Sequence, residues 1–184
     1  MRELTLALVL SLLLAGVAHA TLSVVSGPET YEGHVYYMLE ASSWTDAEAS
    51  AVELGGHLVT INDSDENLWV IGTFGGEDYA LWTGLSDAAH EGTFEWSSGE
   101  AFTYGLPLGT SPPWAPNEPA GEHADYDYVN IHRGSHPSGP ELWNDWPDGG
   151  IGTCHGIVEI PEPATVMLMV LGGLALIRRG KMQI

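Results

Sequence analysis

The 184-residue chain has very few basic residues and almost no cysteine. It contains five Lys and Arg residues against 25 Asp and Glu residues, and its formal net charge at pH 7 is -20. Only Arg133 among the basic residues lies away from the two chain ends. Because a nucleic-acid interface needs Lys and Arg against phosphates, nucleic acid is excluded as a partner. The single cysteine, Cys154, cannot form an internal disulfide, so a folded domain here must depend on its hydrophobic core.

The N-terminus has the pattern of a secretory signal peptide, residues 1–20. Arg2 precedes the apolar run Leu4–Val17, and Ala18-His19-Ala20 gives a small-residue exit. These three features in this order are typical of signal peptides. The apolar run is short for a membrane-spanning helix, which needs about 20 residues. The pattern therefore predicts export of the protein.

The C-terminus carries a second apolar segment, Ala164–Ile177, which contains no charged residue. As a helix it would reach about 21 Å at ~1.5 Å per residue, which is less than the ~30 Å thickness of a bilayer core. Arg178 and Arg179 follow the segment, and a basic cluster favours the cytoplasmic side of a membrane. On physical grounds this segment is a marginal transmembrane span with its tail inside.

The same region begins with Pro161-Glu162-Pro163, continues with the apolar run and ends with Arg178-Arg179 and a short tail. In this order these features resemble a PEP-CTERM sorting signal, residues 161–184. The resemblance implies a Gram-negative bacterium in which an exosortase recognises and removes the tail. The protein would then be anchored only transiently in the inner membrane, on its way to the cell surface or the extracellular matrix. The alternative is a simple C-terminal membrane anchor.

Residues 21–160 have the length of one domain. An aromatic and branched stretch, Tyr31–Leu39, predicts a strand. The spacing of apolar residues from Trp44 to Leu54 predicts an amphipathic helix, with either Ser43 or a Thr45-x-x-Glu48 capping box at its start. A second capping box, Asp63-x-x-Glu66, predicts the start of another helix.

Short strand-like segments dominate the rest of the domain, including Leu81–Leu85, Tyr128–Ile131 and His155–Ile160. Two early helices followed by strands indicate an α+β domain. Between Gly99 and Asp127 lies a long stretch with five prolines. A loop of that length inside a compact domain is usually functional or disordered.

Several short motifs follow one another along the chain: Trp44-x-x-Ala47, Leu54-Gly55-Gly56-His57-Leu58, Trp82-Thr83-Gly84-Leu85, Glu91-Gly92-x-Phe94-x-Trp96, Glu118-Pro119, Trp143-Asn144-Asp145 and Val158-Glu159-Ile160. In this order they resemble the C-type lectin-like domain. The resemblance covers Gly33–Ile160 and implies two helices, two small antiparallel sheets and a long loop region. The two disulfides usual in the family are absent, since Tyr128 and Val158 stand where cysteines would be.

The resemblance also implies a calcium site that holds a sugar, because in sugar-binding members one calcium ion takes two vicinal sugar hydroxyls. Glu118, Asn144 and Asp145 match its ligands, and Pro119 matches the proline that turns the backbone between ligands. Calcium takes six to eight oxygens. Ala120 has no side-chain oxygen where one is expected.

Other residues of the long loop stand at expected ligand positions or could replace missing ligands. Tyr126 stands where a carboxylate is expected, and Glu122 or Asp125 are candidate substitutes from the same acidic loop. Trp114 and Tyr126 are candidates for stacking on a sugar ring.

A second calcium position of the family is partly retained. Asp87-x-x-x-Glu91 has its spacing, and Asp127 matches its third acid, while Gly121 and Tyr126 replace the other two ligands. In the family this site shapes the long loop and does not touch sugar.

These patterns predict an exported, non-enzymatic carbohydrate-binding module, assisted by calcium, whose partner is an extracellular glycan or exopolysaccharide. No nucleophile paired with a general base is visible, so catalysis is not expected. The alternative function is protein–protein interaction or adhesion through a lectin fold with a degenerate, metal-free sugar site. Ala120 and Tyr126 favour this alternative.

Overall fold

The fold comes from a computed structural model that describes residues 21–120, 125–132, 142–149 and 154–161. Ten elements follow one another along the chain. They are β1 (Val24–Tyr31), β2 (His34–Ala41), α1 (Trp44–Glu53), β3 (His57–Leu58), α2 (Ser64–Phe74), β4 (Ala80–Ser86), β5 (Glu95–Trp96), β6 (Tyr128–Ile131), β7 (Trp143–Trp146) and β8 (Cys154–Ile160). The predicted α+β class is therefore confirmed.

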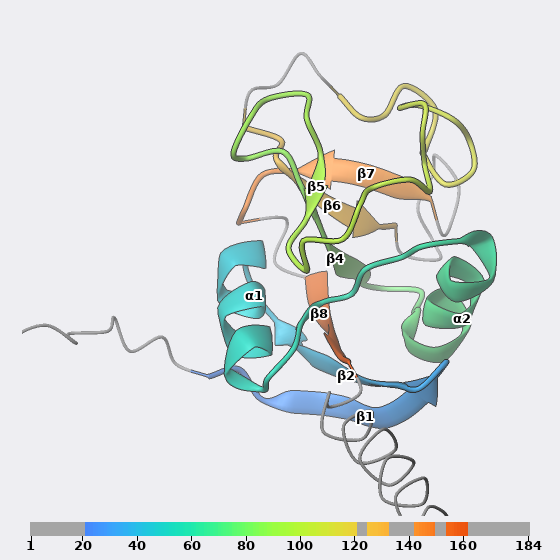
Figure 1. The fold of residues 1–184 in the computed structure, drawn as a ribbon. Helices are drawn as coiled ribbons and strands as arrows, with labels where there is room; N and C mark the ends of the chain where they lie inside the picture. Colours follow the sequence, from blue (N-terminus) through green and yellow to red (C-terminus); the bar gives the residue numbers. More distant parts are fainter. Residues whose placement is uncertain (1–20, 121–124, 133–141, 150–153, 162–184) are drawn as a thin grey trace, which may run out of the picture.

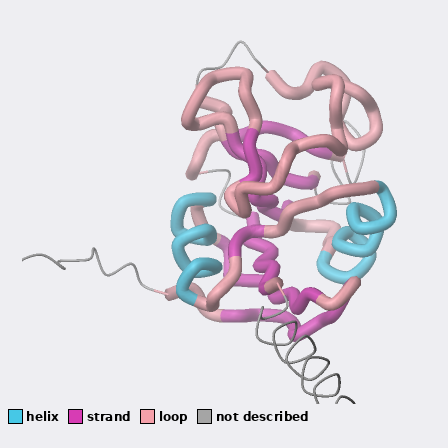
Figure 2. Tube along the Cα trace, in the orientation of Figure 1, coloured by secondary structure: helices cyan, strands magenta, loops and turns pink. Residues whose placement is uncertain are grey.

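The strands form one mixed sheet in the order β1-β2-β8-β4-β6-β7, with β3 added to β8 and β5 added to β4. The helices α1 and α2 lie on either side of β8, and the loops gather at the far end of the molecule from β1 (Figures 1 and 2). The resemblance implied two small antiparallel sheets. The strands join instead, because β8 pairs with β2 on one edge and with β4, in parallel, on the other.

The first hairpin differs from the sequence prediction. The predicted strand Tyr31–Leu39 corresponds to β2, and β1 was not predicted at all. The interior Gly27-Pro28 hides β1 in the sequence, because proline is tolerated in a sheet only at edges and bulges. Here β1 is an edge strand with two register shifts. The turn to β2 is made by Glu32 and Gly33, both with positive φ, as a two-residue hairpin turn requires.

Both predicted helix starts are confirmed. Ser43 caps α1, and its side chain accepts a hydrogen bond from the Asp46 backbone N–H at 3.1 Å. Asp63 caps α2 and accepts from the backbone N–H groups of Asp65 and Glu66. Such caps satisfy backbone donors that have no partner inside the helix.

The core is built around three tryptophans with no exposed surface, Trp82, Trp114 and Trp143. The Trp114 and Trp143 rings pack edge to face with centroids 5.7 Å apart. Their indole N–H groups donate to the Gly105 carbonyl and to Asn67 Oδ1, each at 2.9 Å. The packing of Trp114 on Trp143 ties the long loop to β7, the strand that contains Asn144 and Asp145.

Gly84, in the predicted Trp82–Leu85 core strand, allows two backbones to approach closely. A Cβ at this position would lie 2.6 Å from the Leu58 carbonyl oxygen and 2.7 Å from Ser97 Oγ. The Gly84 N–H donates to the Val59 carbonyl at 2.9 Å, and the Ser97 N–H donates to the Gly84 carbonyl at 2.8 Å. A side chain at Gly84 would push β4 away from the backbone of Leu58 and from Ser97.

We therefore expect Gly84→Ala to lower the free energy of unfolding by about 1–3 kcal/mol, the usual cost of overpacking. The matched control is Gly72→Ala on the exposed face of α2, where a Cβ meets nothing within 4 Å. That change should stabilise by up to about 1 kcal/mol, because alanine is the better helix former. Urea unfolding of both variants measures the difference, and equal stabilities would contradict the proposed packing.

Candidate functional site

The long loop, the segment after β4 and the strand β7 enclose a cavity of about 400 Å³, here called the acidic cavity. Its described lining consists of Asp87, Glu91, Gly92, Phe94, Leu108, Gly109, Asn117, Glu118, Pro119 and Asp145. Acidic residues of both predicted calcium positions therefore face one space. They come from segments that are up to 58 residues apart in the chain, from Asp87 to Asp145.

Glu118 and Asp145 form a pair of carboxyl groups in this cavity. The Glu118–Pro119 peptide bond is cis. Burial raises the pKa of Glu118 from 4.5 to about 8, and a hydrogen bond to Asp145 and repulsion by its charge act in the same direction. At neutral pH, Glu118 therefore retains a proton when no cation is present.

The backbone of Ala120 orients Asp145. The Ala120 N–H donates to Asp145 Oδ1 at 2.8 Å and to Oδ2 at 2.9 Å. The Asp145 side chain is buried, with a relative exposure of 2 %. Ala120 thus contributes to the site through its main chain, although it has no side-chain oxygen. Sequence reasoning missed this role, because a backbone donor leaves no signal in the residue type.

Asp87 is held on the opposite wall of the acidic cavity. Its Oδ2 accepts from the Gly92 backbone N–H at 2.8 Å, and its own N–H donates to the Asp127 carbonyl at 3.1 Å. Burial raises the pKa of Asp87, and the charges of Glu91 and Asp127 raise it further. Burial also raises the pKa of Asp127, with added repulsion from Asp125 and Asp145. This clustering of carboxylates disfavours their charged forms.

Three buried oxygens in and beside the cavity have no hydrogen-bond partner among the described residues: Asp87 Oδ1, Glu118 Oε2 and Asn144 Oδ1. A buried acceptor without a partner costs about 1–3 kcal/mol. Asn144 lies on β7 between Trp143 and Asp145 and pairs with Asn130 on β6, outside the described lining of the cavity. Within the part of the chain that is described, no three His, Cys, Asp or Glu side chains form a ready-made metal cluster. The donor chemistry suits a hard cation, but the side chains are not yet gathered around one point.

Two aromatic residues expected to meet a sugar are placed differently. Trp114 has no exposed surface, so the expectation that it stacks on a sugar ring is wrong. Its ring belongs to the core because it packs between Phe94 and Trp143. Tyr126 is half-buried against Trp146, with centroids 5.3 Å apart.

Several predicted features lie outside the described residues. These are the signal peptide 1–20, Gly121, Glu122, the apolar segment Ala164–Ile177 and all of the sorting signal except Pro161. Neither of the two helices in the described residues has the length and apolar character needed to cross a membrane.

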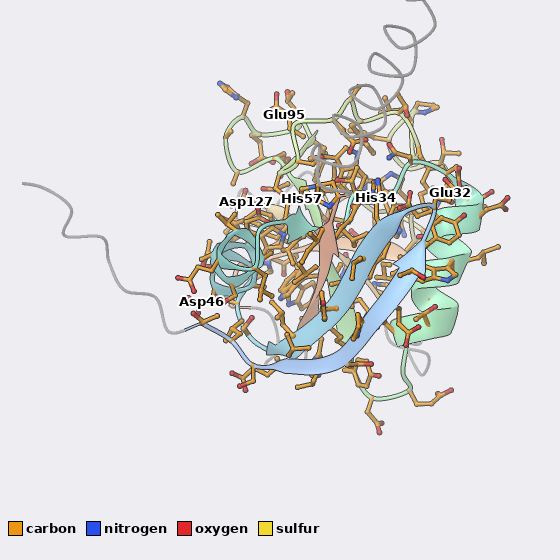
Figure 3. The ribbon with its side chains drawn as sticks, turned by 60° about the horizontal axis from the view of Figure 1, so that its bottom comes forward. Glu32, His34, Asp46, His57, Glu95 and Asp127 are labelled. Carbon is orange, nitrogen blue, oxygen red and sulfur yellow. The ribbon has the colours of Figure 1, made fainter. Side chains whose placement is uncertain are left out.

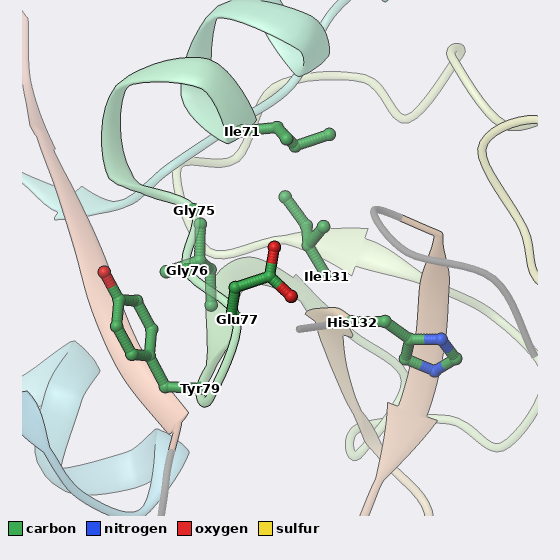
Figure 4. Close-up of a pocket in the computed structure, with 8 residues that line it drawn as sticks. Ile71, Gly75, Gly76, Glu77, Tyr79, Ile131 and His132 are labelled. Carbon is green, nitrogen blue, oxygen red and sulfur yellow. The ribbon is translucent and has the colours of Figure 1, made fainter. Parts of the chain in front are cut away.

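A separate hollow of about 210 Å³ lies between the end of α2 and the strands β4 and β6 (Figure 4). Its described lining is Ile71, Gly75, Gly76, Glu77, Tyr79, Leu81, Ile131 and His132. The Glu77 carboxyl group points into the space between Ile131 and Gly76 (Figure 4). None of the predicted calcium or sugar ligands lines this hollow. The candidate site is therefore the acidic cavity.

Residues 40–147 match the family model "Lectin C-type domain". The match covers more than half of the chain. This protein belongs to the C-type lectin domain family. The motifs from Trp44 to Asp145 that carried the resemblance fall within the matched region.

Relatives from several animals resemble this chain over part or most of its length. The chain is 32 % identical over 140 residues to "Lactose-binding lectin l-2" of Anguilla japonica, covering 72 % of this chain and 80 % of the relative. It is 39 % identical over 80 residues to "Snaclec bothrojaracin subunit beta" of Bothrops jararaca, covering 41 % and 53 %. For several relatives the chain spans about half of their length or less, such as 27 % of the human "C-type lectin domain family 17, member A".

Solved structures support the fold of the lectin domain. The carbohydrate-recognition domain of cow CD23, solved in the presence of a GlcNAc2Man3 oligosaccharide, has a TM-score of 0.59 and 23 % identity, covering 72 % of this chain and 92 % of the other. A calcium-independent type II antifreeze protein has a TM-score of 0.60 and 22 % identity, covering 79 % and 99 %. At these identities the likeness concerns the fold alone.

The raised pKa of Glu118 predicts a pH-dependent stability in the presence of chelator. Its ordinary value is 4.5 and its folded value is about 8, so the unfolded chain releases this proton at lower pH. The contribution is fully present below pH 4.5 and is lost as the pH rises through 8. As the pH rises from 4.5 to about 8, we expect the melting temperature of Glu118→Gln to fall less than that of the wild type.

The matched control for this measurement is Glu29→Gln, an exposed carboxylate on β1 that removes the same formal charge far from the acidic cavity. Its pH profile should follow the wild type. Identical profiles for all three proteins would show that Glu118 does not titrate differently in the folded protein.

Proposed function

We propose that this lectin-domain protein is an exported, calcium-assisted carbohydrate-binding module. The observation that carries the proposal is the pair of buried, unpartnered oxygens of Asp87 and Glu118 in the acidic cavity, together with the buried, unpartnered oxygen of Asn144, which precedes the cavity residue Asp145 on β7. All three are acceptors, and carboxylate and amide oxygens are the ligands that calcium prefers. A relative named for lactose binding and a fold neighbour solved with an oligosaccharide agree with a glycan partner, such as an extracellular exopolysaccharide.

Glu118, Asn144 and Asp145 would hold the sugar-associated calcium ion, and Asp87, Glu91 and Asp127 would hold a second one. The bound ion would supply coordination positions for two vicinal hydroxyls of a sugar. Glu118 and Asn144 each have a second polar atom that can bond a sugar hydroxyl while the first contacts the ion. Asp145 is kept in position by the Ala120 N–H, and Pro119 lines the cavity beside Glu118.

The cation would also relieve the electrostatic cost of this site. Without it, burial and the charge of Asp145 both disfavour the charged form of Glu118, and its pKa is raised. A divalent ion beside two carboxylates favours their charged forms. Calcium should therefore release the proton of Glu118 and remove the loss of stability that rising pH causes in chelator.

A second candidate function is adhesion through protein contact, without metal or sugar and without catalysis. It is favoured by Ala120 and Tyr126 at two expected ligand positions. The two functions differ in whether the acidic cavity takes up calcium.

Calorimetric titration of the purified protein with calcium tests the proposal. We expect heat of binding for the wild type and for Glu29→Gln, and at least a tenfold weaker affinity for Glu118→Gln and Asp145→Asn, because each removes a charged ligand oxygen. Calcium at about 100 times its dissociation constant should raise the free energy of unfolding by about 2.7 kcal/mol. A glycan screen with and without chelator then tests the sugar site.

The outcomes separate the two functions. Glycan binding that chelator and Glu118→Gln both abolish supports the calcium-assisted module. If calcium gives no heat of binding and no glycan binds, the calcium-assisted module is overturned and the adhesion function is left. Calcium binding without any glycan binding keeps the metal site and rejects the sugar function.

We further propose that residues 1–20 and the tail 161–184 are processing signals, with the tail recognised by an exosortase after transient inner-membrane anchoring. Intact-mass spectrometry of the protein recovered from the cell surface checks this. The mature N-terminus should be Thr21, and the apolar segment up to Arg178-Arg179 should be missing. A surface protein that retains Arg178 and Arg179 would indicate a simple anchor.

A further inference from the structure

A second cleft, here called the aromatic cleft, lies beside the segment that carries Asp87. It has a volume of about 250 Å³ and is lined by Trp44, Gly84, Ser86, Ala88, Ala89, Glu95, Trp96, Ser97 and Tyr128. Ser86 and Ala88 line this cleft, whereas Asp87 between them lines the acidic cavity. The two hollows therefore lie on opposite sides of one short segment. None of the predicted calcium ligands lines the aromatic cleft.

Two aromatic rings in the cleft are fixed in place. The Trp44 indole N–H donates to the Thr83 carbonyl at 2.7 Å, and the Trp44 backbone N–H donates to the Asp148 carbonyl at 3.2 Å. The Tyr128 ring packs on Trp44 with centroids 4.7 Å apart and a tilt of 31°. Both side chains are only half-buried, so this pair offers a rigid aromatic wall to a ligand.

Glu95 is the one charged side chain among the described residues that line the cleft. Glu95 is exposed on β5, and its carboxylate has no hydrogen-bond or ion-pair partner in the part of the chain that the structure describes. Figure 3 places Glu95 well away from His34 and His57. Burial, then the charges of Asp148 and Asp127, raise the pKa of Tyr128. All five Lys and Arg residues of the chain lie outside the described residues.

The hydroxyl groups of the cleft can bind further polar atoms. Ser86 Oγ accepts from the Ala88 N–H at 3.2 Å, which leaves its own O–H free to donate. Ser97 Oγ donates to Glu48 at 3.1 Å and can still accept. The cleft thus combines an aromatic wall, an unpaired carboxylate, one hydroxyl donor and one hydroxyl acceptor.

We propose that the aromatic cleft binds a protonated amino sugar, with its ammonium group held by Glu95 and against the Trp44–Tyr128 pair. A cation over the face of tryptophan or tyrosine is attracted by the ring. A sugar also presents apolar C–H faces that suit aromatic rings, and hydroxyls that suit Ser86 and Ser97. This site is separate from the proposed calcium site, because it needs no metal and uses none of the same side chains.

The test titrates the full chain with glucosamine and with N-acetylglucosamine in the presence of chelator, at about pH 6, where ordinary amines are protonated. Tryptophan fluorescence is the readout, since Trp44 and Trp96 line the cleft. We expect glucosamine to bind at least tenfold more tightly than its neutral acetylated counterpart. Binding should weaken as salt is added, because the attraction is between charges.

The variants identify the site. Glu95→Gln should weaken glucosamine binding by about fivefold, the upper range for an exposed ion pair, and Tyr128→Leu should weaken it through loss of the ring. Glu29→Gln, on the exposed face of β1, should bind glucosamine like the wild type. Since Glu95 is exposed, Glu95→Gln is expected to fold, and its melting temperature checks this.

Three results would overturn the inference: equal affinity for glucosamine and N-acetylglucosamine, unchanged binding by Glu95→Gln, or glucosamine binding that occurs with calcium but not in chelator. A further arm uses Nα-acetyl-lysine methylamide. If this lysine analogue binds and glucosamine does not, the cleft recognises a basic peptide and the amino-sugar assignment is wrong. Failure of the calcium titration leaves every one of these results unchanged, so the two proposals stand or fall separately.

Discussion

The packing of Trp114 against Trp143 is the contact on which the rest of the functional end depends. Trp143 is the first residue of β7, and the next two residues, Asn144 and Asp145, are candidate calcium ligands. Trp114 belongs to the long loop, which contains no helix or strand of its own in the described residues. The Trp143 N–H donates to Pro113, and the Ala115 N–H donates to the Trp143 carbonyl. These bonds place Glu118 opposite Asp145 without a disulfide.

The acidic cavity illustrates a conflict between stability and binding. The domain gathers carboxylates from three segments into one space. Burial raises the pKa of Asp87, Glu118 and Asp127, and the charges of neighbouring carboxylates raise it further. Such an arrangement is costly for the protein alone, because the charged forms are partly desolvated and repel one another. The cost is a reason to expect a cation, since perturbed groups of this kind concentrate at functional sites.

The two hollows beside the β4–β5 connection suggest how one small domain can recognise a glycan at more than one point. The acidic cavity offers carboxylate oxygens, and the aromatic cleft offers rings and one free carboxylate. The chain has a formal net charge of -20, which gives an anionic ligand an unfavourable field. Both proposed sites are accordingly argued for neutral or cationic sugars.

Much of the fold could be read from local patterns. The caps Ser43 and Asp63, the helix spacing from Trp44 and the strand Leu81–Leu85 depend on neighbours in the chain, which is why they were predictable. The edge strand β1 was missed because Gly27-Pro28 breaks its pattern, and proline there is tolerated only through the strand's position in the sheet. The joining of all strands into one sheet depends on the parallel pairing of β4 with β8, which no local pattern reveals.

The sequence by itself determined the acidic charge, the family resemblance and the identity of Glu118, Asp145 and Asp87 as candidate ligands. Only the tertiary structure decided that these three line one cavity, that Trp114 is buried and that the Ala120 N–H holds Asp145. The aromatic cleft likewise appears only when α1, β5 and β6 meet. The physical reason is that residue type records the chemistry of a side chain, whereas burial, backbone donors and contacts between distant segments arise only when the chain has packed.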